Sequence, residues 1–259
     1  MEIRRVGTPD GFPVVALHGI QGTSDSWVPL ATALGDTFHF ILPNLPGRGD
    51  AGDAGDAAFP TAPEACSADA FARLVSGVIA QEIGARPYVL AGWSMGVSVI
   101  FELMAQLANG TARQAPPVAV MLMSGTAQLN DVRWFEASEG SALLDEIRQR
   151  EIRLGLTRAA HPQVVAWTWQ ALKTVSHLPN LAQVTMPALI VHGSDDEDCP
   201  VAHAYRMREG IRDATLHVIP SARHSLLTQN TQDVGAAVRA FLTEHTAPSQ
   251  PPLNREENS

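Results

Sequence analysis

The sequence predicts an α/β fold with a mostly parallel central sheet and helices on both faces, because strand-like and helical patterns alternate along most of the chain. The predicted strands are short apolar runs, as strands buried on both faces are: 12–17, 38–42, 88–91, 118–123, 188–192 and 215–219. A short edge strand is predicted at 2–6. Apolar residues with helical spacing lie between the runs: 24–35, 67–84, 97–108, 200–210 and 234–242.

The alternation stops between residues 127 and 183. This stretch has helical spacing without a clear strand, and it holds Trp134, Trp167 and Trp169 of the five tryptophans in the chain. Because it is inserted between strands, we expect a helical cap over the strand ends, placed after the sixth strand. The predicted division is a core of 1–126 and 184–245, a cap of 127–183 and a disordered tail of 246–259, rich in proline and polar residues.

Composition excludes several kinds of protein. A chain of 259 residues with 45% hydrophobic residues suffices for one large domain, and a net charge of −9 argues against nucleic acid or an anionic membrane as partner. Neither a signal peptide nor an apolar stretch of about 18 residues is visible, which predicts no membrane span and a cytoplasmic protein. Its two cysteines, Cys66 and Cys199, are expected to be free thiols. Homo-oligomerisation is left open.

A long loop is predicted from residue 43 to about Cys66. Its middle, 51–57, is small and acidic, but the aspartate spacing does not fit a calcium-binding loop with its closing glutamate. We therefore interpret it as a surface loop.

The stretch around Ser94 carries the main functional signal. The apolar run 88–91 leads into Gly92-Trp93-Ser94-Met95-Gly96, and a helical pattern follows until Asn109-Gly110. A strand, a tight turn with glycine on both sides of a serine, and a helix form the setting in which G-x-S-x-G exposes a nucleophilic hydroxyl. The glycines permit a turn too tight for side chains.

A serine hydroxyl needs a base, and the base needs a carboxylate to orient it. In open α/β sheets these groups follow the carboxyl ends of strands. Of the nine histidines, only His224 combines a loop after a late strand with small or polar neighbours. Asp195, Asp196 and Asp198 all follow the run 188–192; the G-x-x-D-x-x-x-P spacing from Gly193 to Pro200 favours Asp196, and Asp131 is an outside candidate.

The chain resembles the α/β-hydrolase fold superfamily, in the branch of BioH-like esterases, lactonases and meta-cleavage product hydrolases. The matching pieces are Leu17-His18-Gly19 with Trp27, 43–49, 92–96, 191–200 and 219–224. The resemblance implies that Ser94 is the nucleophile, His224 the base and then the acid, and Asp196 its orienting carboxylate. It also implies an oxyanion hole made by the backbone N–H groups of Ile20 and Met95.

The sequence departs from the family pattern at four positions. Gln21 stands where proline is frequent, Asn44 and Arg48 stand where aspartate and histidine are frequent, and Val97 replaces a common glycine. None of these changes removes a catalytic group, so they affect the subfamily more than the reaction type.

The predicted function is a serine hydrolase that cleaves a small to medium carboxylic ester or thioester through an acyl-Ser94 intermediate, with no cofactor and no metal. Trp93, Trp134 and Trp167 are candidates for the substrate pocket, with packing between cap and sheet as the alternative for each tryptophan of the cap. Alternative functions are a cofactor-free carbon–carbon bond hydrolase, lyase, cyclase or perhydrolase on the same fold. A non-catalytic ligand receptor is a third alternative, against which the intact set of Ser94, Asp196 and His224 argues.

Overall fold

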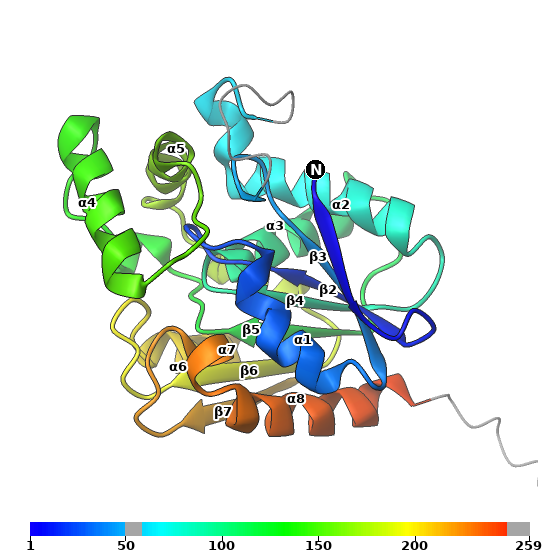
Figure 1. The fold of residues 1–259 in the computed structure, drawn as a ribbon. Helices are drawn as coiled ribbons and strands as arrows, with labels where there is room; N and C mark the ends of the chain where they lie inside the picture. The colour runs from blue at the N-terminus through cyan, green and yellow to red at the C-terminus, as the bar shows by residue number, and fades with distance from the viewer. Residues whose placement is uncertain (50–58, 248–259) are drawn as a thin grey trace, which may run out of the picture.

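The computed structural model describes residues 1–49 and 59–247, and its centre is a seven-stranded sheet (Figure 1). The strands are β1 (Ile3–Gly7), β2 (Phe12–Leu17), β3 (Phe38–Pro43), β4 (Val89–Trp93), β5 (Ala119–Met123), β6 (Ala188–Gly193) and β7 (Ala214–Ile219). Their order is β1-β3-β2-β4-β5-β6-β7. β1 runs antiparallel to β3, whereas the other neighbours pair in parallel. The predicted fold class is confirmed.

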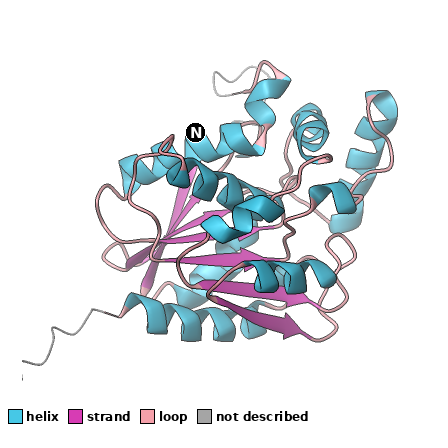
Figure 2. Cartoon of the chain, turned by 180° about the vertical axis from the view of Figure 1, so that it is seen from behind, coloured by secondary structure: helices cyan, strands magenta, loops and turns pink. Residues whose placement is uncertain are grey.

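Helices cover both faces of the sheet (Figures 1 and 2). The α-helices are α1 (Val28–Leu34), α2 (Ala68–Glu82), α3 (Met95–Ala108), α4 (Gly140–Leu154), α5 (Pro162–Leu172), α6 (Ala202–Gly210), α7 (Leu226–Gln229) and α8 (Thr231–Thr246). Short 3-10 turns are η1 (Ser24–Trp27), η3 (Pro63–Cys66), η4 (Leu129–Asp131) and η5 (Leu178–Gln183).

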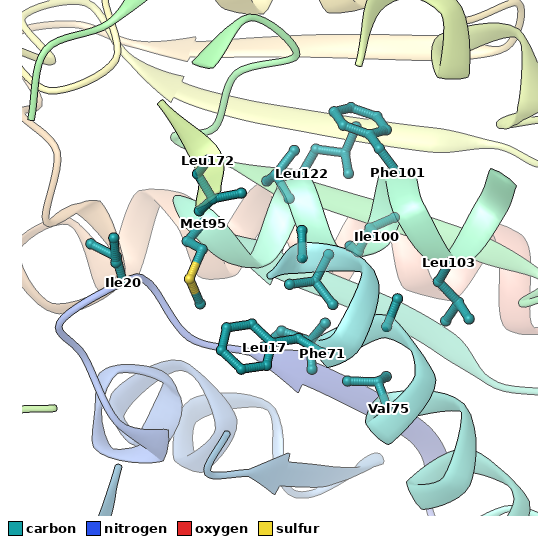
Figure 3. Packing of buried hydrophobic residues seen from close by; sticks show 14 of the residues in the cluster. Leu17, Ile20, Phe71, Val75, Met95, Ile100, Phe101, Leu103, Leu122 and Leu172 are labelled. Atoms are coloured by element: carbon teal, nitrogen blue, oxygen red, sulfur yellow. The ribbon is translucent and has the colours of Figure 1, made fainter. Parts of the chain in front are cut away.

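Side chains of each strand alternate between two apolar cores, because successive residues of a strand point to opposite faces. On β2, Val14 and Ala16 join the core beneath α1 and α8. Val15 and Leu17 face the other core, which Phe71 of α2 and Ile100 of α3 fill (Figure 3). This burial on both faces explains why the parallel strands read as nearly continuous apolar runs.

The stretch between β5 and β6 forms α4, α5 and η5 and contributes no strand. Both helices lie beyond the carboxyl ends of the parallel strands (Figures 1 and 2). The expected position after the sixth strand is wrong: the insertion follows β5, since five strand-forming segments precede it. The helical character predicted for this stretch agrees with the structure.

Other expectations concern the chain end, the long loop, membranes and the cysteines. Helix α8 includes Thr246, so ordered structure extends into the predicted tail. The rest of that tail from residue 248, and the acidic segment 51–57, lie outside the described residues.

Within the described part of the chain, no helix is long and apolar enough to cross a membrane. Cys66 and Cys199 are free thiols, as predicted, and both are buried.

Substitution of one buried residue of α2 tests the core packing. Phe71 is fully buried, so Phe71→Ala should lower the free energy of unfolding by about 3–5 kcal/mol through lost contacts and the cavity left behind. Leu74 on the same helix is 39% exposed, and Leu74→Ala should change it by less than about 0.5 kcal/mol. Urea unfolding of both variants measures this, and equal shifts would contradict the assigned burial.

Candidate active site

Ser94 lies at a sharp turn between β4, which ends at Trp93, and α3, which begins at Met95. Its φ of 55° lies in the left-handed region that residues other than glycine rarely adopt. Backbone contacts explain the flanking glycines: a Cβ on Gly92 would lie 2.6 Å from the backbone of Gly96, and one on Gly96 would lie 2.5 Å from the carbonyl oxygen of Leu17. The local sequence therefore fixes a strained turn that presents the serine at the end of the sheet.

Ser94, His224 and Asp196 form one chain of hydrogen bonds. The Oγ of Ser94 lies 2.9 Å from Nε2 of His224, and Nδ1 of His224 lies 3.0 Å from each carboxylate oxygen of Asp196. All three residues are buried. An ionised Asp196 accepts only, so His224 donates through Nδ1–H and its Nε2 accepts the serine hydroxyl proton.

Asp196 is held as an anion by donors on several sides. Its Oδ1 accepts the backbone N–H groups of Asp198, at 3.0 Å, and Cys199, at 2.8 Å. Burial alone would raise the pKa of Asp196, but the hydrogen bond and charge of His224, the Cys199 N–H and nearby His192 outweigh burial and lower the pKa.

The other candidate carboxylates occupy different positions. Asp195 accepts a hydrogen bond from the hydroxyl of Ser194 at 2.7 Å, and Asp131 forms an exposed ion pair with Arg206. Asp198 is buried and lies on the opposite side of the imidazole from Asp196, with its Oδ2 3.7 Å from Nε2 of His224. Of these acids, Asp196 is the one that meets Nδ1.

The loop after β2 passes close to the serine. A Cβ on Gly19 would lie 3.0 Å from the ring of Trp93 and 3.2 Å from Cβ of Ser94, so the backbone of the loop lies very close to both residues. Ile20 lines the same cavity as Ser94. Met95 is the first residue of α3, and its N–H is one of those that a helix start leaves without an intrahelical acceptor.

Hydrogen bonds from Arg48 and His18 hold the loop after β2 in place. Arg48 is fully buried and donates to the carbonyl oxygen of Ile20 at 2.8 Å and of Pro46 at 2.9 Å, and burial lowers its pKa to about 10. Nε2 of His18 accepts the N–H of Leu45 at 3.1 Å, so its Nδ1–H donates to the Gly19 carbonyl at 2.8 Å. Burial, followed by the charge of Arg48, lowers the pKa of His18 to about 3 and keeps this ring neutral.

A small cavity of about 20 Å³ opens at Ser94 and His224. A neighbouring cavity of about 290 Å³ shares Gly22, Trp93, Leu154 and Leu156 with it. The smaller space suits a reacting group, and the larger one has room for the rest of a ligand of modest size.

The three candidate pocket tryptophans lie in different places. Trp93 lines both cavities and donates its indole N–H to the carbonyl oxygen of His224 at 3.0 Å. Trp134 and Trp167 are not among the described residues that line either cavity. Trp134 stacks on Trp169 at 5.4 Å and Trp167 packs against the core, which is the packing role left open for cap tryptophans.

Sequence reasoning missed Arg150, which lines the cavity at Ser94 from α4. Its only signal was helical spacing from Leu143 and Ile147, which places position 150 on the buried face of the helix. A charged residue on such a face indicates a buried partner, but the pattern does not say which one.

A strained serine between a central parallel strand and a helix, with a histidine and a carboxylate after later strands, defines an α/β-hydrolase-type enzyme. A family model described as the alpha/beta hydrolase family matches residues 14–237, and the chain belongs to this family.

Several proteins with similar chains are hydrolases. The chain is 23% identical to (E)-2-((N-methylformamido)methylene)succinate hydrolase of Acinetobacter baylyi, over 90% of this chain and 91% of the relative. It is 26% identical to pimeloyl-[acyl-carrier protein] methyl ester esterase of Nitrosomonas europaea, over 84% and 90%. The structure of a thermophilic esterase from Thermogutta terrifontis superposes with a TM-score of 0.74 at 21% identity, covering 94% of this chain and 93% of the esterase.

Alanine at Gly96 tests the tight turn. The added Cβ would meet the Leu17 carbonyl oxygen at 2.5 Å, so Gly96→Ala should destabilise the fold by about 1–3 kcal/mol or more and displace Ser94. Gly77, exposed on α2 with open space around it, is the matched control, and Gly77→Ala should stabilise by about 0.5–1 kcal/mol. Urea unfolding measures both, and a neutral Gly96→Ala would contradict the close approach.

The neutral, buried His18 predicts a pH-dependent stability. Its folded pKa of about 3 lies below the usual 6.5, so the unfolded chain takes up a proton first as pH falls. The stability is therefore fully present above pH 6.5 and is lost toward pH 3, at about 1.4 kcal/mol per pH unit. Between pH 7 and 5, the parent should lose about 2 kcal/mol more than His18→Gln in urea unfolding. Parallel losses would contradict this assignment.

Proposed function

We propose that the protein is a serine hydrolase in which Ser94 is the nucleophile, His224 the general base and then acid, and Asp196 the carboxylate that orients His224. The observation that carries the proposal is the hydrogen-bonded chain from Ser94 Oγ through His224 to Asp196, at 2.9 and 3.0 Å. Its location at the carboxyl ends of parallel strands is where α/β proteins bind ligands.

The geometry supports acyl transfer in two halves. Nε2 of His224 takes the hydroxyl proton while Ser94 Oγ attacks the acyl carbon, and the same proton then passes to the leaving oxygen or sulfur. A water molecule repeats the sequence on the acyl-serine and releases the acid. Asp196 keeps Nδ1 protonated throughout and offsets the imidazolium charge.

The backbone N–H groups of Ile20 and Met95 would stabilise the oxyanion of each tetrahedral intermediate. Each such donor contributes about 2.7–4 kcal/mol to the transition state. The close approach of the Gly19 backbone to Ser94 supports this role for the loop, and the hydrogen bond from Arg48 to the Ile20 carbonyl fixes its path.

We propose a small to medium carboxylic ester or thioester as the substrate. The reacting carbonyl group would enter the cavity at Ser94, and the remainder would extend into the neighbouring cavity of about 290 Å³ past Trp93. Similarity to an esterase of pimeloyl-[acyl-carrier protein] methyl ester along most of the chain favours this class.

A second candidate is hydrolysis of a bond other than an ester, through the same three residues. It is favoured by the similarity to (E)-2-((N-methylformamido)methylene)succinate hydrolase, which extends over 91% of that relative. Both candidates share the nucleophile, so the products formed from matched ester and non-ester substrates distinguish them.

Covalent labelling and turnover test the proposal. A fluorophosphonate should add its phosphonyl group to Ser94, seen as a mass gain on the peptide that contains residue 94. Short- and medium-chain p-nitrophenyl esters and acyl thioesters should be hydrolysed, and His224→Ala should lower kcat by about 10⁶-fold because the base is lost.

Ser94→Ala is the control for the label, and circular dichroism should report His224→Ala as folded. Near-normal turnover in His224→Ala would show that another group is the base. An unlabelled parent protein without turnover would favour a non-catalytic receptor, and labelling without hydrolysis would favour a lyase or cyclase.

A further inference from the structure

A buried ion pair connects the α4–α5 insertion to the loop that carries Asp196. Nη2 of Arg150, on α4, donates to Oδ2 of Asp198, and the two side chains are only 5% and 7% exposed. The same Oδ2 lies 3.7 Å from Nε2 of His224. The carboxylate of Asp198 therefore lies near Nε2 of His224, the nitrogen that is hydrogen-bonded to Ser94, and the guanidinium of Arg150 binds this carboxylate.

Arg150 is anchored on its other side by the loop that contains Ile20. Its Nη1 donates to Oε1 of Gln21 at 2.7 Å, and Nε2 of Gln21 donates to the carbonyl oxygen of Ile147 at 2.9 Å. The guanidinium also lies over the ring of Phe135, 5.8 Å from its centroid. These contacts hold the positively charged guanidinium of Arg150 in one position.

We propose that Arg150 is a positioning residue for the reaction: it pairs with the carboxylate of Asp198 beside His224, offsets its negative charge and so leaves Nε2 unprotonated and free to take the Ser94 proton. The inference rests on the proposed function, since it assigns the state of the base in that mechanism.

Charge and geometry give the physical reason. The imidazole already has Asp196 at Nδ1, and an unpaired carboxylate 3.7 Å from Nε2 would hold a proton there. Such a proton would occupy the lone pair that must accept the Ser94 hydroxyl proton. With Arg150 bound to Asp198, the two charges offset each other, and the Ser94–His224 hydrogen bond remains.

Other charged or titratable groups also lie near His224. His192, at the end of β6, lies behind Asp196, with Nε2 3.5 Å from its Oδ2. Arg153, Glu197 and Arg223 line the cavity outside His224, where Glu197 and Arg223 pair with each other. Arg150 is the cation that binds the carboxylate next to Nε2.

Removal of the guanidinium tests the inference through the pH dependence of kcat/KM. In Arg150→Met, the acid limb of the profile should move up by about one pH unit, which lowers kcat/KM below that limb about tenfold. In the double variant Arg150→Met with Asp198→Asn, the limb should return to the parent position, because no carboxylate remains to hold the proton. Arg150→Lys should restore most of the parent profile.

Arg148→Met on the same helix is the matched control, because Arg148 pairs with Asp145 at the exposed surface and should leave the profile unmoved. If Arg150→Met does not fold, Asp198→Asn alone should move the limb to lower pH, since Arg150 then acts on His224 unopposed. An unmoved limb in Arg150→Met or in Asp198→Asn would overturn the inference. The inference would also be overturned if the acid limb of the double variant stayed at the position found in Arg150→Met, because a purely structural ion pair would give that result.

The rate of fluorophosphonate labelling of Ser94 against pH provides a second readout. It needs the free base and no particular substrate, so it separates this inference from the proposed function. A parent protein that does not label contradicts the proposed function. A parent that labels with the same pH dependence as Arg150→Met contradicts only the role of Arg150.

Discussion

The backbone conformation of Ser94 is the constraint on which the rest of the site depends. A serine at φ 55° is held only where the surrounding structure fixes the turn on both sides. Here β4 is buried between β2 and β5, and Gly96 packs its backbone against the Leu17 carbonyl of β2. The same approach brings the loop after β2 to the serine, so one tight contact between neighbouring elements orients both the hydroxyl and the loop that contains Ile20.

Much of this arrangement can be predicted from local sequence, because it follows from short-range rules. Apolar runs alternating with helical spacing predict the sheet and its helices, and Gly92 and Gly96 around Ser94 predict the turn. Asp196 and His224 follow later strands, and parallel strands bring their carboxyl ends to one edge. The contacts of the insertion's tryptophans were not available in this way, since they depend on how the insertion packs against the strand ends.

The residues that depart from the family pattern show the same limit. Gln21 contacts α4, the side chain of Asn44 accepts the N–H of Ser24 at 2.7 Å, and Arg48 donates to the loop carbonyl of Ile20. Each buried polar side chain needs partners, because an unsatisfied one costs about 1–3 kcal/mol. Sequence reveals that such a residue is unusual, but its partner lies up to 129 positions away, as Arg150 does from Gln21, and only the folded chain brings the two together.

The clustered acids after β6 place one imidazole between two carboxylates, an arrangement that bears on the proposed function of His224 as a base. Asp196 accepts two backbone N–H groups as well as Nδ1–H, so three donors stabilise its negative charge. The N–H of Asp198 donates to Asp196, and the carboxylate of Asp198 lies 3.7 Å from Nε2, where an unpaired anion would favour a protonated imidazole that has no lone pair left for the Ser94 proton. The guanidinium of Arg150 offsets that charge from a helix outside the parallel-sheet core. A substitution in the helices inserted between β5 and β6 can therefore change the basicity of the histidine without altering Ser94, His224 or Asp196.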